Sequence, residues 1–174
     1  MKGGLSFFLY ICAIFMLKKM RRITMMLLAL CCCLISCDPQ KNGKELIQRN
    51  FYNDTWERFD YVVKDVEIDK PTTFDLSMQI SFTDDYPYDF IDLIFVVFTP
   101  EGDRYRAREY RHKLKDKEGH WNADGVDGVH TFVLPINKEL QINDTGTYRF
   151  QLEQKMPITP VVGVKELTLI NNAI

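Results

Sequence analysis

The stretch TFDLSMQISFT, residues 73–83, decides the fold. Apolar side chains at every second position, from Phe74 to Phe82, alternate with polar ones over its whole length. This period of two is typical of an amphipathic strand that has one face on a core and one face in water. Residues 73–83 are therefore predicted to form a half-buried strand of a β-sheet.

The same patterning recurs along the chain. Residues 91–98, IDLIFVVF, are apolar on both faces after Asp92, which predicts a central strand. Tyr148, Phe150 and Leu152 alternate with polar residues, which predicts another half-buried strand. Weaker strand patterns cover residues 59–67, 104–110, 129–136 and 161–170.

Turn sequences rich in Asp, Asn, Gly and Pro separate these segments, as at residues 100–103 and 143–146. About seven to eight short strands joined by such turns predict an all-β fold, an antiparallel β-sandwich. Residues 144–150, DTGTYRF, resemble the tyrosine corner of immunoglobulin-like sandwiches, where the hydroxyl of Tyr148 would bond to the backbone just upstream. An ordinary glycine turn is the alternative, so an immunoglobulin-like and a jelly-roll-like sandwich both stay open.

The amino-terminal part has the plan of a bacterial lipoprotein signal. A basic run, KKMRR at residues 18–22, precedes a short apolar run at residues 23–36. The sequence LISC, which ends at Cys37, resembles the lipobox. This resemblance implies cleavage before Cys37 and acyl chains, such as palmitate, on that residue. An uncleaved transmembrane helix is the alternative, but residues 23–36 are fewer than the roughly 20 residues that span a bilayer.

These patterns divide the chain into three parts. They are a helical signal segment at residues 1–36 (with Met16 or Met20 as the possible true start), the lipidated Cys37 with a tether at residues 37–50, and a β-sandwich at residues 51–174. Within the tether, residues 45–50 are expected to make at most a turn of helix.

Charge and cysteine content differ sharply between these parts. Residues 1–36 hold five of the 22 Lys and Arg and none of the 24 Asp and Glu, so the remainder carries −7 rather than −2. An acidic body argues against a nucleic-acid partner. All five cysteines lie at or before Cys37. With Cys37 acylated, disulfides, cysteine-ligated metals and a cysteine nucleophile are excluded from the mature body.

Few patterns indicate catalysis or metal binding. His112, His120 and His130 match no zinc spacing and are expected at the surface. Asp, Glu and Asn within residues 116–127 are a candidate calcium loop, but they lack the EF-hand spacing and also suit turns. No nucleophile or nucleotide motif is present. We therefore expect no enzyme, no cofactor and no metal; a hydrolase stays as an alternative that requires a cleft with convergent carboxylates or histidines.

Two groups of residues are candidates for contact with a partner. Arg104, Arg106 and Arg108 share a strand face in the basic run of residues 104–117. They would suit anionic lipid or an acidic partner, and the alternative is a charged edge strand that resists edge-to-edge pairing. The second group consists of aromatic residues, which are contacts only if exposed, since such rings are also common in cores: Trp56, Tyr86, Tyr88 and Trp121.

A family resemblance is carried by seven short segments: Trp56 with Phe59, Tyr86-Pro87-Tyr88, Pro100 with Gly102, Gly119-His120-Trp121, Gly146-Thr147-Tyr148-Arg149-Phe150, Gln154-Lys155-Met156 and Gly163-Val164. In order and spacing they resemble the gliding-motility lipoprotein family GldH of Bacteroidetes. The resemblance covers the chain from about residue 51 to the end, and it supplies no catalytic residue.

The resemblance implies a lipid-anchored, periplasm-facing lipoprotein of the cell envelope. It implies a non-enzymatic component associated with the machinery of gliding motility and protein secretion, with envelope proteins as partners. The alternative function is a glycan-binding β-sandwich lipoprotein of a polysaccharide-handling system, in which exposed aromatic rings stack on sugars.

Overall fold

The computed structural model describes residues 43–173. The predictions of a helical signal segment, a lipid on Cys37 and a tether at residues 37–42 lie outside these residues. Within them, no helix is long and apolar enough to cross a membrane.

The described chain is built from antiparallel strands and one short 3-10 turn. In chain order the elements are β1 (Lys44–Asn50), η1 (Tyr52–Asp54), β2 (Thr55–Trp56), β3 (Val62–Ile68), β4 (Thr72–Thr83), β5 (Phe90–Phe98), β6 (Arg104–Lys113), β7 (Gly125–Val126), β8 (Val129–Ile142), β9 (Gly146–Gln154), β10 (Val161–Val162) and β11 (Val164–Asn171).

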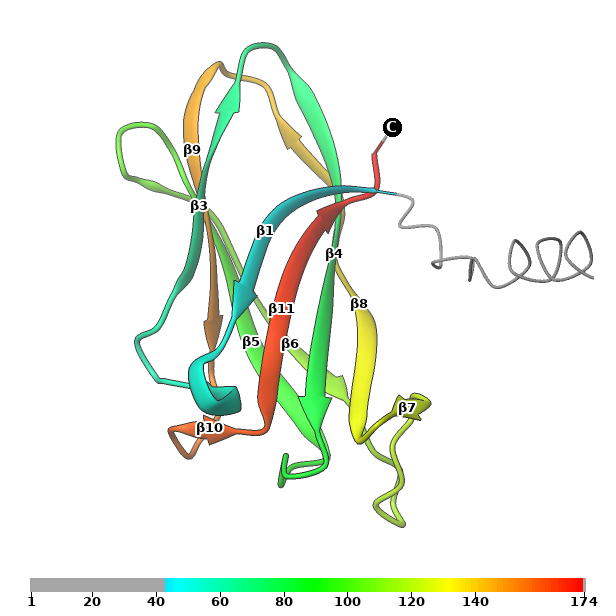
Figure 1. Cartoon of the computed structure of the whole chain (residues 1–174). Coiled ribbons are helices and arrows are strands. Elements are labelled where there is room, and N and C mark those ends of the chain that lie inside the picture. Colours follow the sequence, from blue (N-terminus) through cyan, green and yellow to red (C-terminus); the bar gives the residue numbers. More distant parts are fainter. Residues whose placement is uncertain (1–42, 174) are drawn as a thin grey trace, which may run out of the picture. The chain divides into compact units, whose positions relative to one another are not determined.

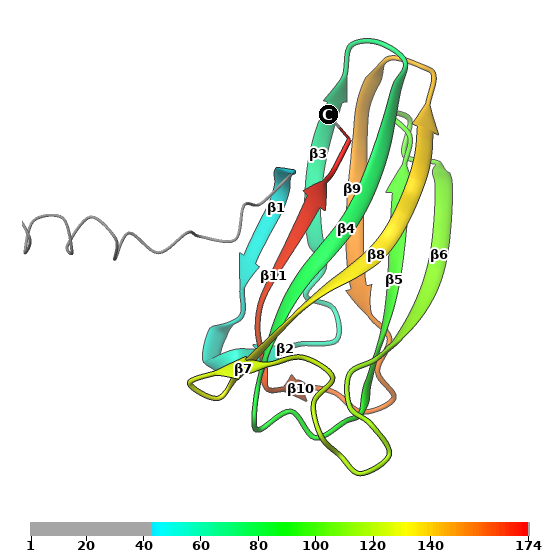
Figure 2. The same cartoon turned by 90° about the vertical axis from the view of Figure 1, so that its right-hand side faces the viewer.

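Two sheets form the sandwich, and Figures 1 and 2 show them as two layers. One sheet has the order β1-β11-β4-β8-β7, the other has the order β3-β9-β5-β6, and β10 pairs with β2 in a small third sheet. The predicted antiparallel β-sandwich is confirmed.

The pairing order identifies the type of sandwich. Among the long strands, the first pairs with the last (β1 with β11), the second with the second last (β3 with β9), the third with the third last (β4 with β8), and β5 with β6. Successive pairs alternate between the two sheets. A folded hairpin of this kind is the jelly-roll arrangement, so the jelly-roll-like alternative is the one observed.

The core lies between the two sheets and follows the alternation of β4. Phe74, Leu76, Met78, Ile80 and Phe82 are each at most 4% exposed. Full burial of such a side chain stabilises the fold by about 1.5–3 kcal/mol. The opposite face of β4 is more buried than its pattern predicts, since Ser77 and Ser81 are only 8% and 2% exposed. The reason is that β4 lies between β8 and β11 in its sheet.

The prediction for residues 45–50 is wrong, because they form β1 rather than a turn of helix. β1 pairs antiparallel with β11, where Gln48 lies opposite Thr168. Backbone hydrogen bonds to a neighbouring strand override a weak local preference for helix. The sandwich therefore begins at Lys44 rather than at Phe51, which shortens the predicted tether.

The strand predicted at residues 161–170 is divided in two by Gly163. This glycine has φ +80, and a Cβ on it would lie 2.5 Å from the backbone nitrogen of Tyr86. Only glycine accepts both the left-handed backbone and the close approach. The chain therefore turns at Gly163 between the short β10 and the long β11.

The tyrosine corner is not formed. Tyr148 is 2% exposed on β9, and its ring packs edge-to-face on Tyr105 at 5.8 Å between centroids. Within residues 43–173, no hydrogen bond joins its hydroxyl to the backbone upstream. Packing against Tyr105 of β6, in the same sheet, rather than a corner bond, holds this tyrosine.

Candidate functional site

Four long connections gather at one end of the sandwich, which we call the loop end. They are residues 51–61, 84–89, 114–128 and 155–163, and Figure 1 shows them around η1, β7 and β10. The short turns lie at the other end, where Lys44 at the start of β1 pairs with Asn171 at the end of β11. β1 extends about 23 Å from there toward the loop end, at 3.3 Å per residue.

Trp56 is buried at the loop end and is 0% exposed. Its indole Nε1 donates a 2.7 Å hydrogen bond to the carbonyl of Asp60, and its ring stacks on Phe51 with centroids 4.9 Å apart. Both the N–H group and the ring of this side chain are therefore in contact with other residues inside the molecule. Trp56 therefore closes the connection at residues 51–61 and offers no surface to a partner.

Tyr86 is also buried, with 1% of its surface exposed. Its hydroxyl donates a 2.8 Å hydrogen bond to the carbonyl of Phe90, and burial raises the pKa of the phenol far above its usual range. Tyr88 is half-buried and packs edge-to-face on Tyr86 at 5.6 Å. Of these two predicted contact residues, only Tyr88 reaches the surface.

Trp121 is half-buried in the connection between β6 and β8. His130 stacks against its indole with centroids 4.3 Å apart, and Lys115 places Nζ 4.2 Å from the ring centroid. Lys115 donates a 2.7 Å hydrogen bond to the carbonyl of Tyr86, and desolvation lowers the pKa of its ammonium group. His130 Nε2 lies 2.9 Å from a carboxylate oxygen of Asp84.

These contacts show what the predicted aromatic set does. Trp56 and Tyr86 are core residues, and Trp121 joins two connections through stacked rings and a cation. The exposure that contact with a partner requires is absent from Trp56 and Tyr86 and only partial in Tyr88 and Trp121. The set does not come together as one exposed row of rings.

The predicted basic residues lie on the edge strand β6, and all three are exposed. Arg106 pairs in register with Val97 and Arg108 with Phe95, two residues that face the core. The side chains of Arg106 and Arg108 therefore leave β6 on its inner face at the open side of the sandwich. Arg104 lies opposite Phe98 beyond a register shift, so the prediction that the three arginines share one strand face is wrong. Within the described residues, Arg104, Arg106 and Arg108 form no ion pair, and Arg108 lies over the ring of Tyr110 at 5.4 Å.

Two of the three histidines lie beside different carboxylates, His120 beside Asp116 and His130 beside Asp84. Among residues 43–173, no three His, Cys, Asp or Glu side chains group to hold a metal ion. In the candidate calcium loop, Oδ1 of Asp116 accepts the backbone N–H groups of Glu118 and His120 at 2.9 and 2.8 Å. This carboxylate therefore stabilises a turn.

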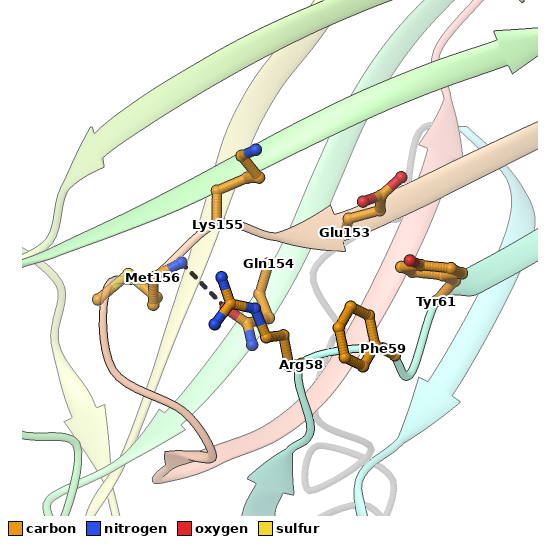
Figure 3. A pocket seen from close by; sticks show the side chains of 7 residues that line it. All are labelled: Arg58, Phe59, Tyr61, Glu153, Gln154, Lys155 and Met156. Atoms are coloured by element: carbon orange, nitrogen blue, oxygen red, sulfur yellow. Dashed lines mark hydrogen bonds between the residues drawn. The ribbon is translucent and has the colours of Figure 1, made fainter.

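A hollow of about 210 Å³, which we call the Gln154 hollow, lies between the connection at residues 51–61 and the end of β9. Figure 3 shows its lining, which the sequence did not single out as a site. The lining consists of Arg58, Phe59, Tyr61, Glu153, Gln154, Lys155 and Met156.

Two exposed rings and one buried amide distinguish this hollow. Phe59 and Tyr61 are 74% and 41% exposed and meet edge-to-face at 6.5 Å. Gln154 is 4% exposed; its Oε1 accepts the N–H of Met156 at 2.9 Å, while its Nε2 has no hydrogen-bond partner among the described residues. Arg58 forms no ion pair within residues 43–173.

Two further hollows lie on the outer face of the same sheet, and the arginine in each is already paired. One of about 480 Å³ contains Arg149, whose Nε lies 2.9 Å from Asp65; this hydrogen bond lowers the pKa of that carboxyl. Another of about 370 Å³ contains Arg111 and Asp92, which are 2.6 Å apart. The Gln154 hollow is the one of these three that combines an unpaired cation with an unpaired buried donor.

Sequence reasoning missed this hollow because its parts are far apart in the chain. Phe59 fell within a predicted strand at residues 59–67, and Gln154 followed the alternation of β9. The strand β3 begins only at Val62, so Phe59 and Tyr61 stand in the preceding loop. The unpartnered amide has no signature in the sequence.

Comparison with known proteins identifies one family. The model of the GldH lipoprotein family matches residues 47–169. No curated protein and no solved structure matches the chain.

Proposed function

The chain belongs to the GldH lipoprotein family, and from this membership we propose that it is a periplasm-facing, non-enzymatic component associated with the machinery of gliding motility and protein secretion. The family implies a lipid anchor in the cell envelope. The position of Cys37 at the end of the lipobox supports that residue as the lipidated one.

The observation that supports an interaction role is the position of the loop end. The chain enters β1 at the end with the short turns, and the four long connections lie at the opposite end. A domain tethered upstream of Lys44 therefore presents its long connections away from its point of attachment. Loops carried on a rigid scaffold are the usual place for binding residues.

The charged side chains support a role without catalysis. On the outer face of the sheet they form ion pairs with one another, Arg149 with Asp65 and Arg111 with Asp92. The imidazole of His130 is held between Trp121 and Asp84, where it packs the loop end. These groups stabilise the fold through the contacts that they make.

Gene deletion followed by crosslinking tests this proposal. Deleting the gene is expected to abolish surface motility and reduce protein secretion, and full-length protein is expected to restore both. Crosslinking in intact cells, followed by purification of the full chain, is expected to recover envelope proteins of that machinery. Normal motility and secretion in the deletion strain would contradict the proposal.

A second candidate function is glycan binding, and the exposed rings of Phe59 and Tyr61 favour it. They meet edge-to-face beside the buried amide of Gln154, in a hollow that is lined by both cationic and anionic side chains. Ligand sites typically combine aromatic walls with a few convergent polar groups. Binding of oligosaccharides to the full-length lipoprotein tests this function directly.

A further inference from the structure

The starting point is the side-chain amide of Gln154, which is 4% exposed. Its oxygen is held by the N–H of Met156 at 2.9 Å, so the orientation of the amide is fixed. Its Nε2 then has two N–H donors and no acceptor in the part of the chain that the structure describes. Buried donors almost always have a partner, so an orphan donor lining a hollow indicates a place for an acceptor atom of a ligand.

The charged residues of the Gln154 hollow indicate the sign of that ligand. Arg58 and Lys155 are cationic and Glu153 is the one acidic residue in the lining. Glu153 already accepts a 2.7 Å hydrogen bond from the amide of Gln151, and Lys155 forms an ion pair with Glu109 at 3.8 Å. Arg58 has no ionic partner among residues 43–173. The groups left without a partner are therefore hydrogen-bond donors, and a ligand carboxylate would accept from them.

The rings indicate the body of the ligand. Phe59 is 74% and Tyr61 41% exposed, and their planes meet at 86°. A ring face that stands free in water is a stacking surface for the C–H face of a sugar, because the electron-rich face attracts polarised C–H groups. The hydroxyl of Tyr61 adds a donor and acceptor.

The size of the hollow indicates the number of units. It has a volume of about 210 Å³, below the roughly 300–1,000 Å³ of sites for drug-sized ligands. One ring-sized unit fits such a volume, and the rest of a chain would extend into solvent. Figure 3 shows Arg58 and Gln154 together, with Phe59 and Tyr61 to one side.

We propose that the Gln154 hollow binds one acidic sugar unit of the uronic acid type. Arg58 holds its carboxylate, its C–H face stacks on Phe59 or Tyr61, and a ring or hydroxyl oxygen accepts from Nε2 of Gln154. The exposed side chain of Arg58 shifts to admit that oxygen. The inference rests on the second candidate function, glycan binding, and names its ligand class.

The test measures binding of two sugars to the full-length lipoprotein, purified in mild detergent and immobilised. The probes are a galacturonic acid trisaccharide and a neutral galactose trisaccharide, titrated by biolayer interferometry. We expect the acidic sugar to bind at least tenfold more tightly than the neutral one. Raising the salt concentration is expected to reduce this preference, because the carboxylate contacts are ionic.

Variants assign the binding to the hollow. Arg58→Gln is expected to remove most of the preference for the acidic sugar, and Phe59→Ala to weaken both sugars at least tenfold. Tyr52→Ala is the matched control for the ring, because Tyr52 is 86% exposed and lies outside the hollow. Arg104→Gln is the matched control for the cation.

Gln154→Glu tests the amide itself, since it keeps an oxygen for the N–H of Met156 and removes the two donors. It is expected to lower affinity for the acidic sugar at least tenfold. A thermal unfolding curve checks that the variant folds; if it does not, Arg58→Gln and Phe59→Ala decide the matter.

Several results would overturn the inference. Equal binding of the two sugars removes the acidic ligand but leaves glycan binding intact. Absence of binding to both sugars contradicts glycan binding as well. Binding that Arg58→Gln and Phe59→Ala leave unchanged places the site elsewhere, and acidic peptides bound in place of sugars assign the hollow to a protein partner.

Discussion

The imidazole of His130 lies flat on the indole of Trp121, with ring centroids 4.3 Å apart and planes 15° from parallel. Phe82 of β4 and Lys115 of the same connection also contact this indole. Trp121 therefore links the long connection at residues 114–128 to β8 and to the core. Its role in stability can be separated from any role in binding.

Trp121→Ala is expected to lower the free energy of unfolding by about 2–4 kcal/mol, because a large half-buried ring leaves a cavity. Urea unfolding followed by circular dichroism measures the change. The control is Tyr52→Ala, which removes an 86% exposed ring and is expected to change stability by less than about 0.5 kcal/mol. Equal effects of the two substitutions would show that the stacked cluster does not hold the loop end.

Gly163→Ala is expected to destabilise the protein more than Gly102→Ala. Both glycines have positive φ, which costs alanine about 1–2 kcal/mol. A Cβ on Gly163 would also lie 2.5 Å from the backbone nitrogen of Tyr86, whereas nothing lies within 4 Å of a Cβ on Gly102. Thermal unfolding of the two variants measures the difference, and a smaller effect at Gly163 would contradict the close approach.

His112 is expected to make the free energy of unfolding depend on pH. Desolvation lowers the pKa of its imidazole in the folded protein below the usual value of 6.5, and its Nε2 has no hydrogen-bond partner within residues 43–173. The unfolded chain therefore binds a proton near pH 6.5 that the folded chain does not. The free energy of unfolding should fall as the pH drops below about 6.5 and level off below the folded pKa.

His112→Gln is expected to flatten this dependence between pH 7.5 and pH 5. Urea unfolding at several pH values gives the slope for both proteins. A parallel decline in the two would assign the pH dependence to other groups.

Arg106 and Arg108 are expected to keep the edge strand β6 from pairing with another molecule. Their inward-facing charges at an exposed edge make strand addition unfavourable. The double variant Arg106→Val with Arg108→Val should self-associate at concentrations where the native protein does not. Sedimentation velocity measures this, and Arg106→Lys with Arg108→Lys is the control that keeps the charge. A monomeric valine variant would favour the other role, contact with anionic lipid.

Cys37→Ala is expected to release the protein from the membrane fraction. Without the thiol, no diacylglycerol can be attached and the lipobox cannot be processed. Fractionation of cells that carry either form, followed by immunoblotting, measures the distribution. Retention of the variant in the membrane fraction would contradict Cys37 as the anchor.

Period-two alternation predicted the strands and their inward faces well, because burial on one side of a sheet leaves a direct record in the sequence. β4 and β9 form where the pattern places them, and β5 is a central strand between β9 and β6. Residues 44–50 were missed as a strand. The reason is that β1 is an edge strand stabilised by backbone bonds to β11, and its side chains carry almost no alternation.

By itself, the sequence determined the fold class, the family and the expected anchor, since each depends on a local pattern of residues. Only the tertiary structure decided between a jelly roll and an immunoglobulin-like sandwich, because strand order depends on contacts between distant segments. It also decided which rings are core and which are surface. Trp56 and Phe59 are three residues apart, yet one is fully buried and the other is 74% exposed. Their separation reflects the path of the loop over the core, which no spacing in the sequence records.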